Sequence, residues 1–241
     1  MQQSQKTNLN YQNQFPEVDR KKIVDFAHNC LSNKDGEEAL FYLKKDRGLS
    51  DSIISQFKIG FFPSYMKHQL RGRIITPIYD VYGNLIAIST RHIDKNHKSR
   101  FWHEHYDKKF HLYGLSFAKK NIIKYNKAIL VEGEMDVCYL HSHGINIAVG
   151  VSGSAFSVFQ ASLLSRYCSE VYVVFDADDG GRKGVSRLLK MYHDNNLDKF
   201  GLKYISVSLP EKNDPDDYVK NNGINKFINI LKEAKEDEKY L

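Results

Sequence analysis

Residues 128–136 read AILVEGEMD, and residues 171–181 read VYVVFDADDGG. In both segments a short apolar run, of the kind that forms a buried strand, ends in a carboxylate: Glu132 in one and Asp176 in the other. A third apolar run, residues 203–208, precedes the acidic turn DPDD. Ligands of parallel α/β sheets sit at the carboxyl ends of the strands. The sequence therefore predicts one acidic site built from three strand ends.

The carboxylates of this site suit a hard divalent cation. Asp176 and Asp178 are two positions apart, so an extended chain points both side chains to one side. Clustered carboxylate oxygens are ligands that Mg²⁺ and Mn²⁺ prefer. A solvated turn that caps the following helix is the competing interpretation of DADDGG, and Asp136 can equally stabilise the first turn of its helix. Each motif alone has little specificity, whereas the ordered pair on separate strands is far more specific.

From Lys127 onward the pattern alternates between strand and helix. Strands are expected at 128–132, 145–151, 170–176 and 203–208, and helices near 134–143, 156–167, 181–195 and 224–236. Such alternation predicts an α/β fold with a small, mostly parallel, Rossmann-like sheet and helices on both faces. We predict that this domain spans 127–241.

The chain before this domain predicts an α+β basic subdomain at 17–126, after a flexible, Gln- and Asn-rich tail at 1–16. Helices are expected at 17–32 and 36–45, and a third, short helix capped by Ser50 is expected to run through Phe57. The β-type runs at 73–79 and 85–93 are joined by a turn, and 109–115 is one more possible strand. Pro77 favours an edge position or a local break. Residues 94–111 are expected to be a loop or irregular ribbon, in which Phe101 and Trp102 either stack on an unpaired base or pack in the core.

Composition narrows the class of protein. The net charge of +6 is unevenly placed, because residues 66–126 hold twelve Lys/Arg and only four acids. A basic segment beside an acidic metal-type site favours a polyanionic ligand.

The sequence has no apolar run long enough to span a membrane and no signal-peptide core, so we expect an intracellular protein. Its three cysteines form no CxxC and the histidines no helical HxxxH, so no zinc site is expected.

Taken together, these motifs resemble the Toprim domain shared by bacterial-type primases, type IA and II topoisomerases and some nucleases. The likeness is greatest to the DnaG-type primase, whose EGYMD, GTALT, DGDxAG and DPD segments are similar to residues 132–136, 153–157, 176–181 and 214–216. In the basic segment, RGRIITPI at 71–78 and LYGL at 112–115 are also similar to the family's sequence.

The resemblance implies a DNA-directed RNA polymerase that makes short RNA primers on single-stranded DNA for replication, from ribonucleoside triphosphates. It assigns catalytic roles to Glu132, Asp136, Asp176 and Asp178. It assigns two or more Mg²⁺ or Mn²⁺ ions to Glu132, Asp176, Asp178, Asp214 and Asp216. It assigns template or nucleotide phosphates to Arg71, Arg73, Arg91, Arg100 and Lys108.

The sequence also departs from the family. It contains no counterpart of the family's N-terminal zinc-ribbon domain and little after the Toprim-like region, as in a minimal core from a phage or mobile element. We therefore expect a replicative helicase, or a separate zinc-binding or helicase-interacting protein, as a partner in the cytoplasm of a bacterial or phage-infected cell. A Toprim nuclease and a non-catalytic single-strand-binding accessory protein remain alternatives, while the Arg71-x-Arg73 segment favours the primase.

Overall fold

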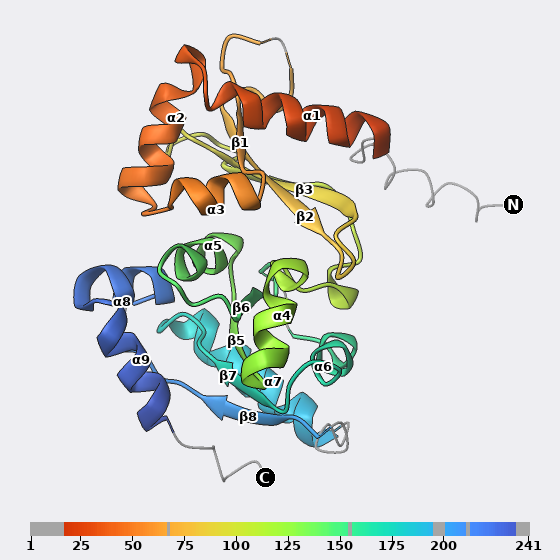
Figure 1. Ribbon diagram of the computed structural model, residues 1–241, viewed down its shortest axis with the longest axis vertical. Coiled ribbons are helices and arrows are strands. Elements are labelled where there is room, and N and C mark those ends of the chain that lie inside the picture. Colours follow the sequence, from red (N-terminus) through yellow and green to blue (C-terminus); the bar gives the residue numbers. More distant parts are fainter. Residues whose placement is uncertain (1–16, 67, 154–155, 195–200, 211–212, 235–241) are drawn as a thin grey trace, which may run out of the picture. The chain divides into compact units, whose positions relative to one another are not determined.

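The computed structural model describes residues 17–66, 68–153, 156–194, 201–210 and 213–234 (Figure 1). The tail predicted at 1–16 lies outside them. The chain forms two compact units. The first runs to Tyr79 and resumes at Gly83–Tyr106, and the second comprises Asp80–Tyr82 and the chain from Asp107. The boundary expected near residue 126 falls inside the second unit, at the end of helix α4 (Leu115–Tyr125).

The first unit is a four-stranded antiparallel sheet with helices. The strand order is β1-β2-β3-β4, with β1 at Gly60–Phe62, β2 at Arg73–Tyr79, β3 at Leu85–His92 and β4 at Phe101–His103. The helical elements are α1 (Glu17–Cys30), η1 (Lys34–Gly36), α2 (Glu37–Phe41), the π-helical η2 (Tyr42–Asp46) and α3 (Asp51–Gln56). The predicted helices and hairpin of this unit are confirmed. Ser50 caps α3 as expected, since its side chain accepts a hydrogen bond from Ile53 N at 3.3 Å.

Helix α1 lies directly on the sheet because β1 begins with glycine. A Cβ at Gly60 would lie 2.5 Å from the backbone of Ala27, so no larger residue fits at this crossing. Val24 and Ala27 of α1 pack with Phe62, Ile75 and other apolar residues in the core of the unit.

Pro77 lies in β2, which is flanked by two strands and is not an edge strand. It is tolerated there because β1 is short: β1 pairs with β2 only as far as Ile75, so the missing N–H of Pro77 interrupts no pairing with β1. A register shift follows at Ile78/Tyr79. The expected local break is therefore present, one residue beyond the proline.

The strand predicted at 109–115 is wrong. Lys108–Phe110 form the 3₁₀ turn η3, and only Tyr113 makes an isolated bridge, to Gly150. Helix α4 then begins at Leu115, after Gly114 takes a left-handed conformation with φ of 80°. Two of the apolar residues that suggested a strand, Leu112 and Leu115, instead pack in the core of the second unit, and only Leu115 belongs to the helix. The segment 94–111, expected to be a loop or irregular ribbon, contains the short strand β4.

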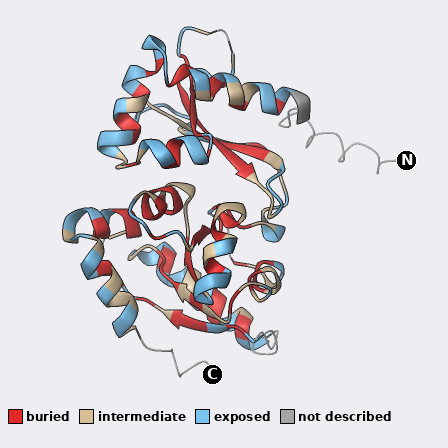
Figure 2. Cartoon of the chain, viewed as in Figure 1, coloured by how far each residue is buried: buried red, intermediate tan, exposed pale blue. Residues whose placement is uncertain are grey.

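The second unit has the predicted fold class. Its four strands are all parallel in the order β6-β5-β7-β8, with β5 at Lys127–Val131, β6 at Ala148–Gly150, β7 at Glu170–Val173 and β8 at Lys203–Ser206. The helices besides α4 are α5 (Glu134–Ser142), α6 (Val158–Leu164), α7 (Asp179–Asp194), α8 (Pro215–Asn222) and α9 (Ile224–Glu233). Residues 128–131 of β5 are at most 1% exposed, as expected for a parallel strand covered on both faces. Figure 2 shows the buried residues concentrated in the sheets and the helix faces against them.

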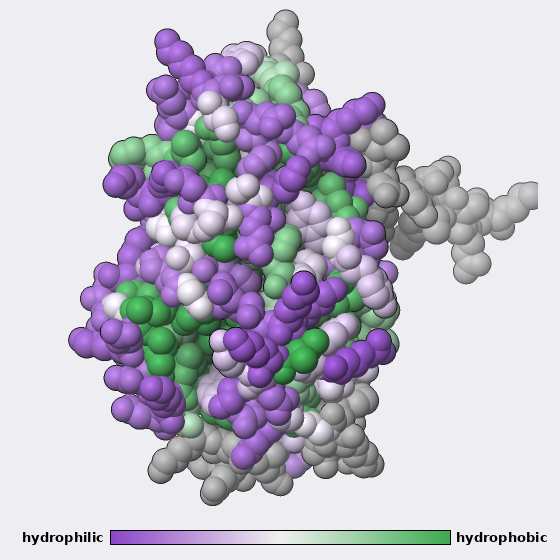
Figure 3. All heavy atoms as spheres, in the orientation of Figure 1, coloured by the Kyte–Doolittle hydropathy of each residue, from purple (hydrophilic) through white to green (hydrophobic). Residues whose placement is uncertain are grey.

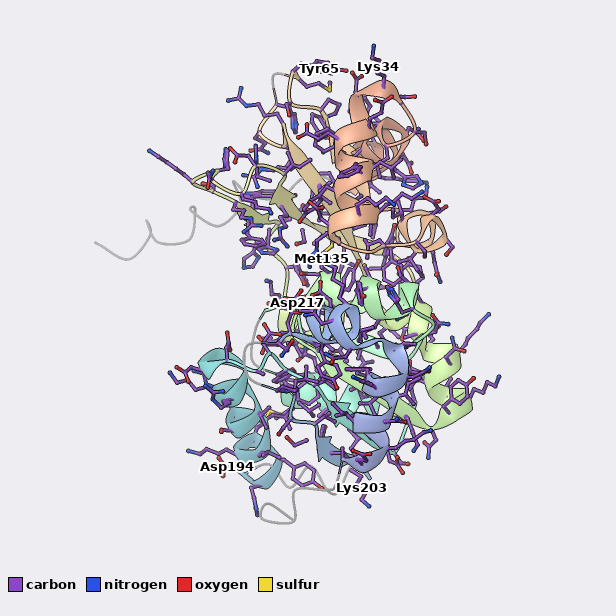
Figure 4. The ribbon with its side chains drawn as sticks, turned by 90° about the vertical axis from the view of Figure 1, so that its left-hand side faces the viewer. Lys34, Tyr65, Met135, Asp194, Lys203 and Asp217 are labelled. Atoms are coloured by element: carbon purple, nitrogen blue, oxygen red, sulfur yellow. The ribbon has the colours of Figure 1, made fainter. Side chains whose placement is uncertain are left out.

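Helices α8 and α9 complete the second unit. They pack against each other, with Phe227 of α9 fully buried. Apolar side chains show between hydrophilic ones over these helices in Figure 3. Helix α8 also packs on α5, and Figure 4 shows Met135 of α5 and Asp217 of α8 close together. This pairing joins the segment after β5 to the segment after β8. No helix in the described ranges is long and apolar enough to cross a membrane.

Candidate metal centre

The three predicted strand ends are linked by two hydrogen bonds that backbone N–H groups donate. Asp176 follows β7 and Glu132 follows β5. The backbone N–H of Asp176 donates a hydrogen bond to Glu132 Oε1 at 3.3 Å. The next residue, Ala177, donates its N–H to the carbonyl of Asn213, which follows β8, at 2.8 Å. The parallel sheet therefore brings its acidic ends to one edge, as the sequence predicts for a sheet of this kind.

Asp176 is the carboxylate most affected by this arrangement. Its pKa is raised to about 7, first by burial and then by the charges of Glu132, Asp214, Asp178 and Asp217, in that order of importance. Its Oδ1 is buried and accepts no hydrogen bond from any residue in the described part of the chain. A buried acceptor among like charges favours either a proton or a cation. The site therefore has the electrostatic character of a cation site.

Glu132 shares this environment. Burial raises its pKa, as does the charge of Asp178, while the hydrogen bond from the N–H of Asp176 acts in the opposite direction. A carboxylate whose pKa is raised is a better proton acceptor than an ordinary one.

A second group of carboxylates comes from α5 and α8, the helices that follow β5 and β8. Single carboxylate oxygens of Asp136, Asp214 and Asp216 all lie within 4.8 Å of one another, and Asp136 and Asp216 are buried. Three oxygens this close fit a single divalent cation. Since Asp214 also acts on the pKa of Asp176, the two groups adjoin and fit a centre with more than one ion.

Helix capping fixes two members of this second group. Asp136 is in the first turn of α5, where its Oδ2 accepts a hydrogen bond from Gly133 N at 3.0 Å. Asp214 is the N-cap of α8, where its Oδ1 accepts from Asp217 N at 2.7 Å. The packing of α5 on α8 then brings the two caps together. Sequence reasoning gave Asp136 a catalytic role but did not include it among the metal ligands, because this tertiary contact leaves no local pattern.

Asp178 and its neighbours form the start of α7. Asp178 is exposed and its Oδ1 accepts a hydrogen bond from Gly181 N at 2.8 Å, so it caps this helix. A Cβ at Gly181 would lie 1.9 Å from the carbonyl oxygen of Asp176. Any side chain there would displace the central carboxylate, so Gly181 supports the site. The sequence signal for it is the Gly-Gly pair directly after the acidic run.

The predicted phosphate-binding residues lie in both units. Arg71, Arg73, Arg91 and Arg100 belong to the first unit, and Lys108 to the second. Arg71 is exposed. Lys108 lies in η3, where its Nζ donates to the carbonyl of Ser152 at 3.0 Å.

Arg73 is only 5% exposed, and its guanidinium is used inside the first unit. It donates to the carbonyls of Ser99 at 2.5 Å and Arg100 at 3.2 Å, and to Thr90 Oγ1 at 3.3 Å. These bonds hold the turn that leads into β4. The structure thus gives Arg73 a positioning role in the loop that carries Arg100.

Solved structures similar to this chain include catalytic cores of DNA primases. The catalytic core of the Escherichia coli primase superposes with a TM-score of 0.81 at 25% identity, over 93% of this chain and 82% of that one. A DnaG primase catalytic domain bound to single-stranded DNA also gives a TM-score of 0.81 at 25% identity, over 91% and 81% of the two chains. The chain has the fold of the DnaG primase catalytic core.

Sequence comparison agrees with this DnaG-type core. A family model described as Toprim-like matches residues 129–219, which lie in the second unit and include all the acidic strand ends. The DNA primase of Clostridium acetobutylicum is 35% identical over 88% of this chain and 40% of its own length. The primase of Aquifex aeolicus is 28% identical over 89% of this chain and 48% of its length. The chain thus spans less than half the length of these relatives.

Proposed function

We propose that the chain is the catalytic core of a DNA primase, which joins ribonucleotides on a single-stranded DNA template by divalent-metal-dependent nucleotidyl transfer. The observation that supports this most is the acidic centre at the strand ends of a DnaG-type fold. Bound Mg²⁺ or Mn²⁺ would supply charge neutralisation for the triphosphate and activation of the attacking 3′-hydroxyl.

The carboxylates divide these tasks by their surroundings. Asp136, Asp214 and Asp216 are close enough to hold one ion together, and Asp176 with Glu132 and Asp178 would hold the second. Glu132 is the candidate to accept the proton of the attacking hydroxyl, because burial brings its pKa closer to neutrality.

The partners and setting follow from the same proposal. The template would be single-stranded DNA, and the substrates would be ribonucleoside triphosphates. Their phosphates would be held by basic side chains, bidentately by arginine and as a point charge by lysine: Arg71, Arg91, Arg100 and Lys108. Loading onto DNA would involve a replicative helicase or a separate zinc-binding protein. The setting would be the cytoplasm of a bacterial or phage-infected cell.

The test is incorporation of labelled ribonucleotides on single-stranded DNA with Mg²⁺ or Mn²⁺, with and without a candidate helicase. Asp176→Asn should reduce incorporation by at least about 100-fold, since it removes a carboxylate that would hold the ion neutralising the transferred phosphate. Asp194→Asn is the matched control: Asp194 is exposed at the end of α7, far from Asp217 within the unit (Figure 4). Equal incorporation by both variants would refute the assignment of the centre.

The same acidic centre would also suit a nuclease that uses water as the nucleophile. The incorporation assay distinguishes the two activities. Loss of labelled DNA in the absence of ribonucleotides, abolished by Asp176→Asn, would indicate hydrolysis. Salt-dependent DNA binding that ignores divalent metal and survives loss of Asp178 would indicate an accessory protein without catalysis.

A further inference from the structure

Phe101 is an exposed aromatic residue between two arginines. It is the first residue of β4, an edge strand of the first sheet, and the residue is 56% exposed. The Arg91 guanidinium carbon lies 5.3 Å from the ring centroid, and that of Arg100 lies 5.5 Å from it. Both distances are within the range of a cation–π interaction. More than half of the side chain remains accessible, so the guanidiniums leave room for a ligand against the ring.

The ring is not needed for the core of the unit. Successive strand residues point to opposite faces, and the adjacent Trp102 packs against the core of Val24, Ala27, Phe62 and their neighbours. The two aromatic residues that sequence reasoning treated together are therefore separated by the strand: Trp102 is structural, and Phe101 faces outward.

The surroundings of Phe101 are held in place before any ligand binds. Arg73 fixes the carbonyls of Ser99 and Arg100, and His92 N also donates to the carbonyl of Arg100, at 2.7 Å. Phe101 itself pairs with Arg91 across the strands. A rigid aromatic surface with fixed cations loses little conformational freedom on binding.

We propose that Phe101 is a base-stacking site, on which an unpaired base of single-stranded DNA lies while Arg91 and Arg100 contact the adjoining phosphates. Every base has a π-face, so such a contact is independent of sequence and suits a template strand. The two fixed cations favour a polyanion over an apolar protein surface at this strand edge. The inference deepens the proposed function, since it names a contact of the template on which that function rests.

The test compares two single strands that differ only in their bases. One is a short oligothymidylate, and the other is an abasic oligonucleotide of equal length. Phe101→Ala should weaken binding of oligothymidylate by about 5- to 150-fold, the range of one stacked base. Binding of the abasic strand and the dependence on salt should stay unchanged, because the phosphate contacts remain.

Two further variants sharpen the result. Phe41→Ala is the matched control, because Phe41 is also exposed, at 62%, in α2 of the same unit; it should bind both strands as the wild type does. Trp102 is the only tryptophan of the chain. The double variant Phe101→Trp, Trp102→Phe therefore carries a single tryptophan at the proposed site, and its fluorescence should be quenched by oligothymidylate and not by the abasic strand.

Three outcomes would overturn the inference, and they are distinguishable. If Phe101→Ala binds oligothymidylate as tightly as the wild type does, the base-stacking site is wrong and the proposed primase function stands. If the variant loses affinity for both strands equally, Phe101 only supports the arginines. If the wild-type protein binds neither strand, the proposed function fails together with the site.

Discussion

Replacing Asp176 with asparagine should stabilise the protein in the absence of divalent metal. The folded state raises the pKa of this carboxyl from 3.8 to about 7, first through burial and then through the neighbouring carboxylates. A difference of this size corresponds to roughly 4 kcal/mol. Solvent screening of a partly accessible group reduces this to about 2 kcal/mol. The stability that the proton provides is fully present below about pH 4 and is lost as the pH rises through about 7. The wild type should therefore be destabilised relative to Asp176→Asn above pH 7, and not at pH 4.

Differential scanning calorimetry in a chelating agent measures this difference directly. For a chain of this size, about 2 kcal/mol raises the melting temperature of the variant by roughly 4–8 °C at pH 8. The gap should narrow when Mg²⁺ is added, because the ion binds the folded wild type and stabilises it by mass action. Asp194→Asn, an equal change of charge at an exposed site, should shift the melting temperature little at either pH. A variant no more stable than the wild type at pH 8 would refute the idea that uncompensated charge gathers at Asp176.

Two other substitutions test the supports of the fold. Gly181→Ala should lower metal-dependent incorporation at least about tenfold, because its Cβ would lie 1.9 Å from the carbonyl oxygen of Asp176. Gly180→Ala should have a milder effect, because its Cβ would lie 3.1 Å from Asp178 Oδ1. Equal activity of the two variants would contradict this. Arg20→Ala should cost about 3–5 kcal/mol, measured by urea unfolding, because Glu104 is 1% exposed and accepts hydrogen bonds from Arg20 at 2.7 and 2.9 Å. Recovery of that stability in the double variant with Glu104→Gln would show that the loss comes from the buried, unpaired charge.

The second unit is largely predictable from its sequence, because its signals are local. Each strand is a short apolar run, and two of the runs end directly in a carboxylate, so the position of the site follows from the general rule for parallel sheets. Helix α8 is the exception. The segment 214–217 is interpretable as a turn, although aspartate at the N-cap followed by proline at the first helical position is a helix-start signal.

The first unit is less predictable at its basic residues. Arg71 and Arg73 have the same side chain two positions apart in a basic segment, and sequence alone gives both a role toward phosphate. The structure separates them, since Arg71 is exposed and Arg73 is buried beneath the turn at 99–100. Burial depends on how that turn folds over β2, which is a contact between distant segments. Charge patterns predict what a region attracts, and only the packing decides which side chains are available to bind.

The same distinction resolves the two interpretations of the acidic motifs. Helix capping and metal binding exclude each other only if a carboxylate can do just one of the two. Asp136, Asp178 and Asp214 each use one oxygen to accept a backbone N–H at the start of a helix, and each has a second oxygen. The capping bond restricts the side-chain rotamer, so that the second oxygen has a fixed position before an ion arrives. In the proposed centre, capping would therefore preorganise the ligands, and the helices that follow the strands would become part of the centre. Asp176 caps no helix, so no backbone N–H of the described residues offsets the repulsion between its carboxylate and the neighbouring negative charges. We therefore expect it to be the member of the proposed centre that is most sensitive to pH and metal.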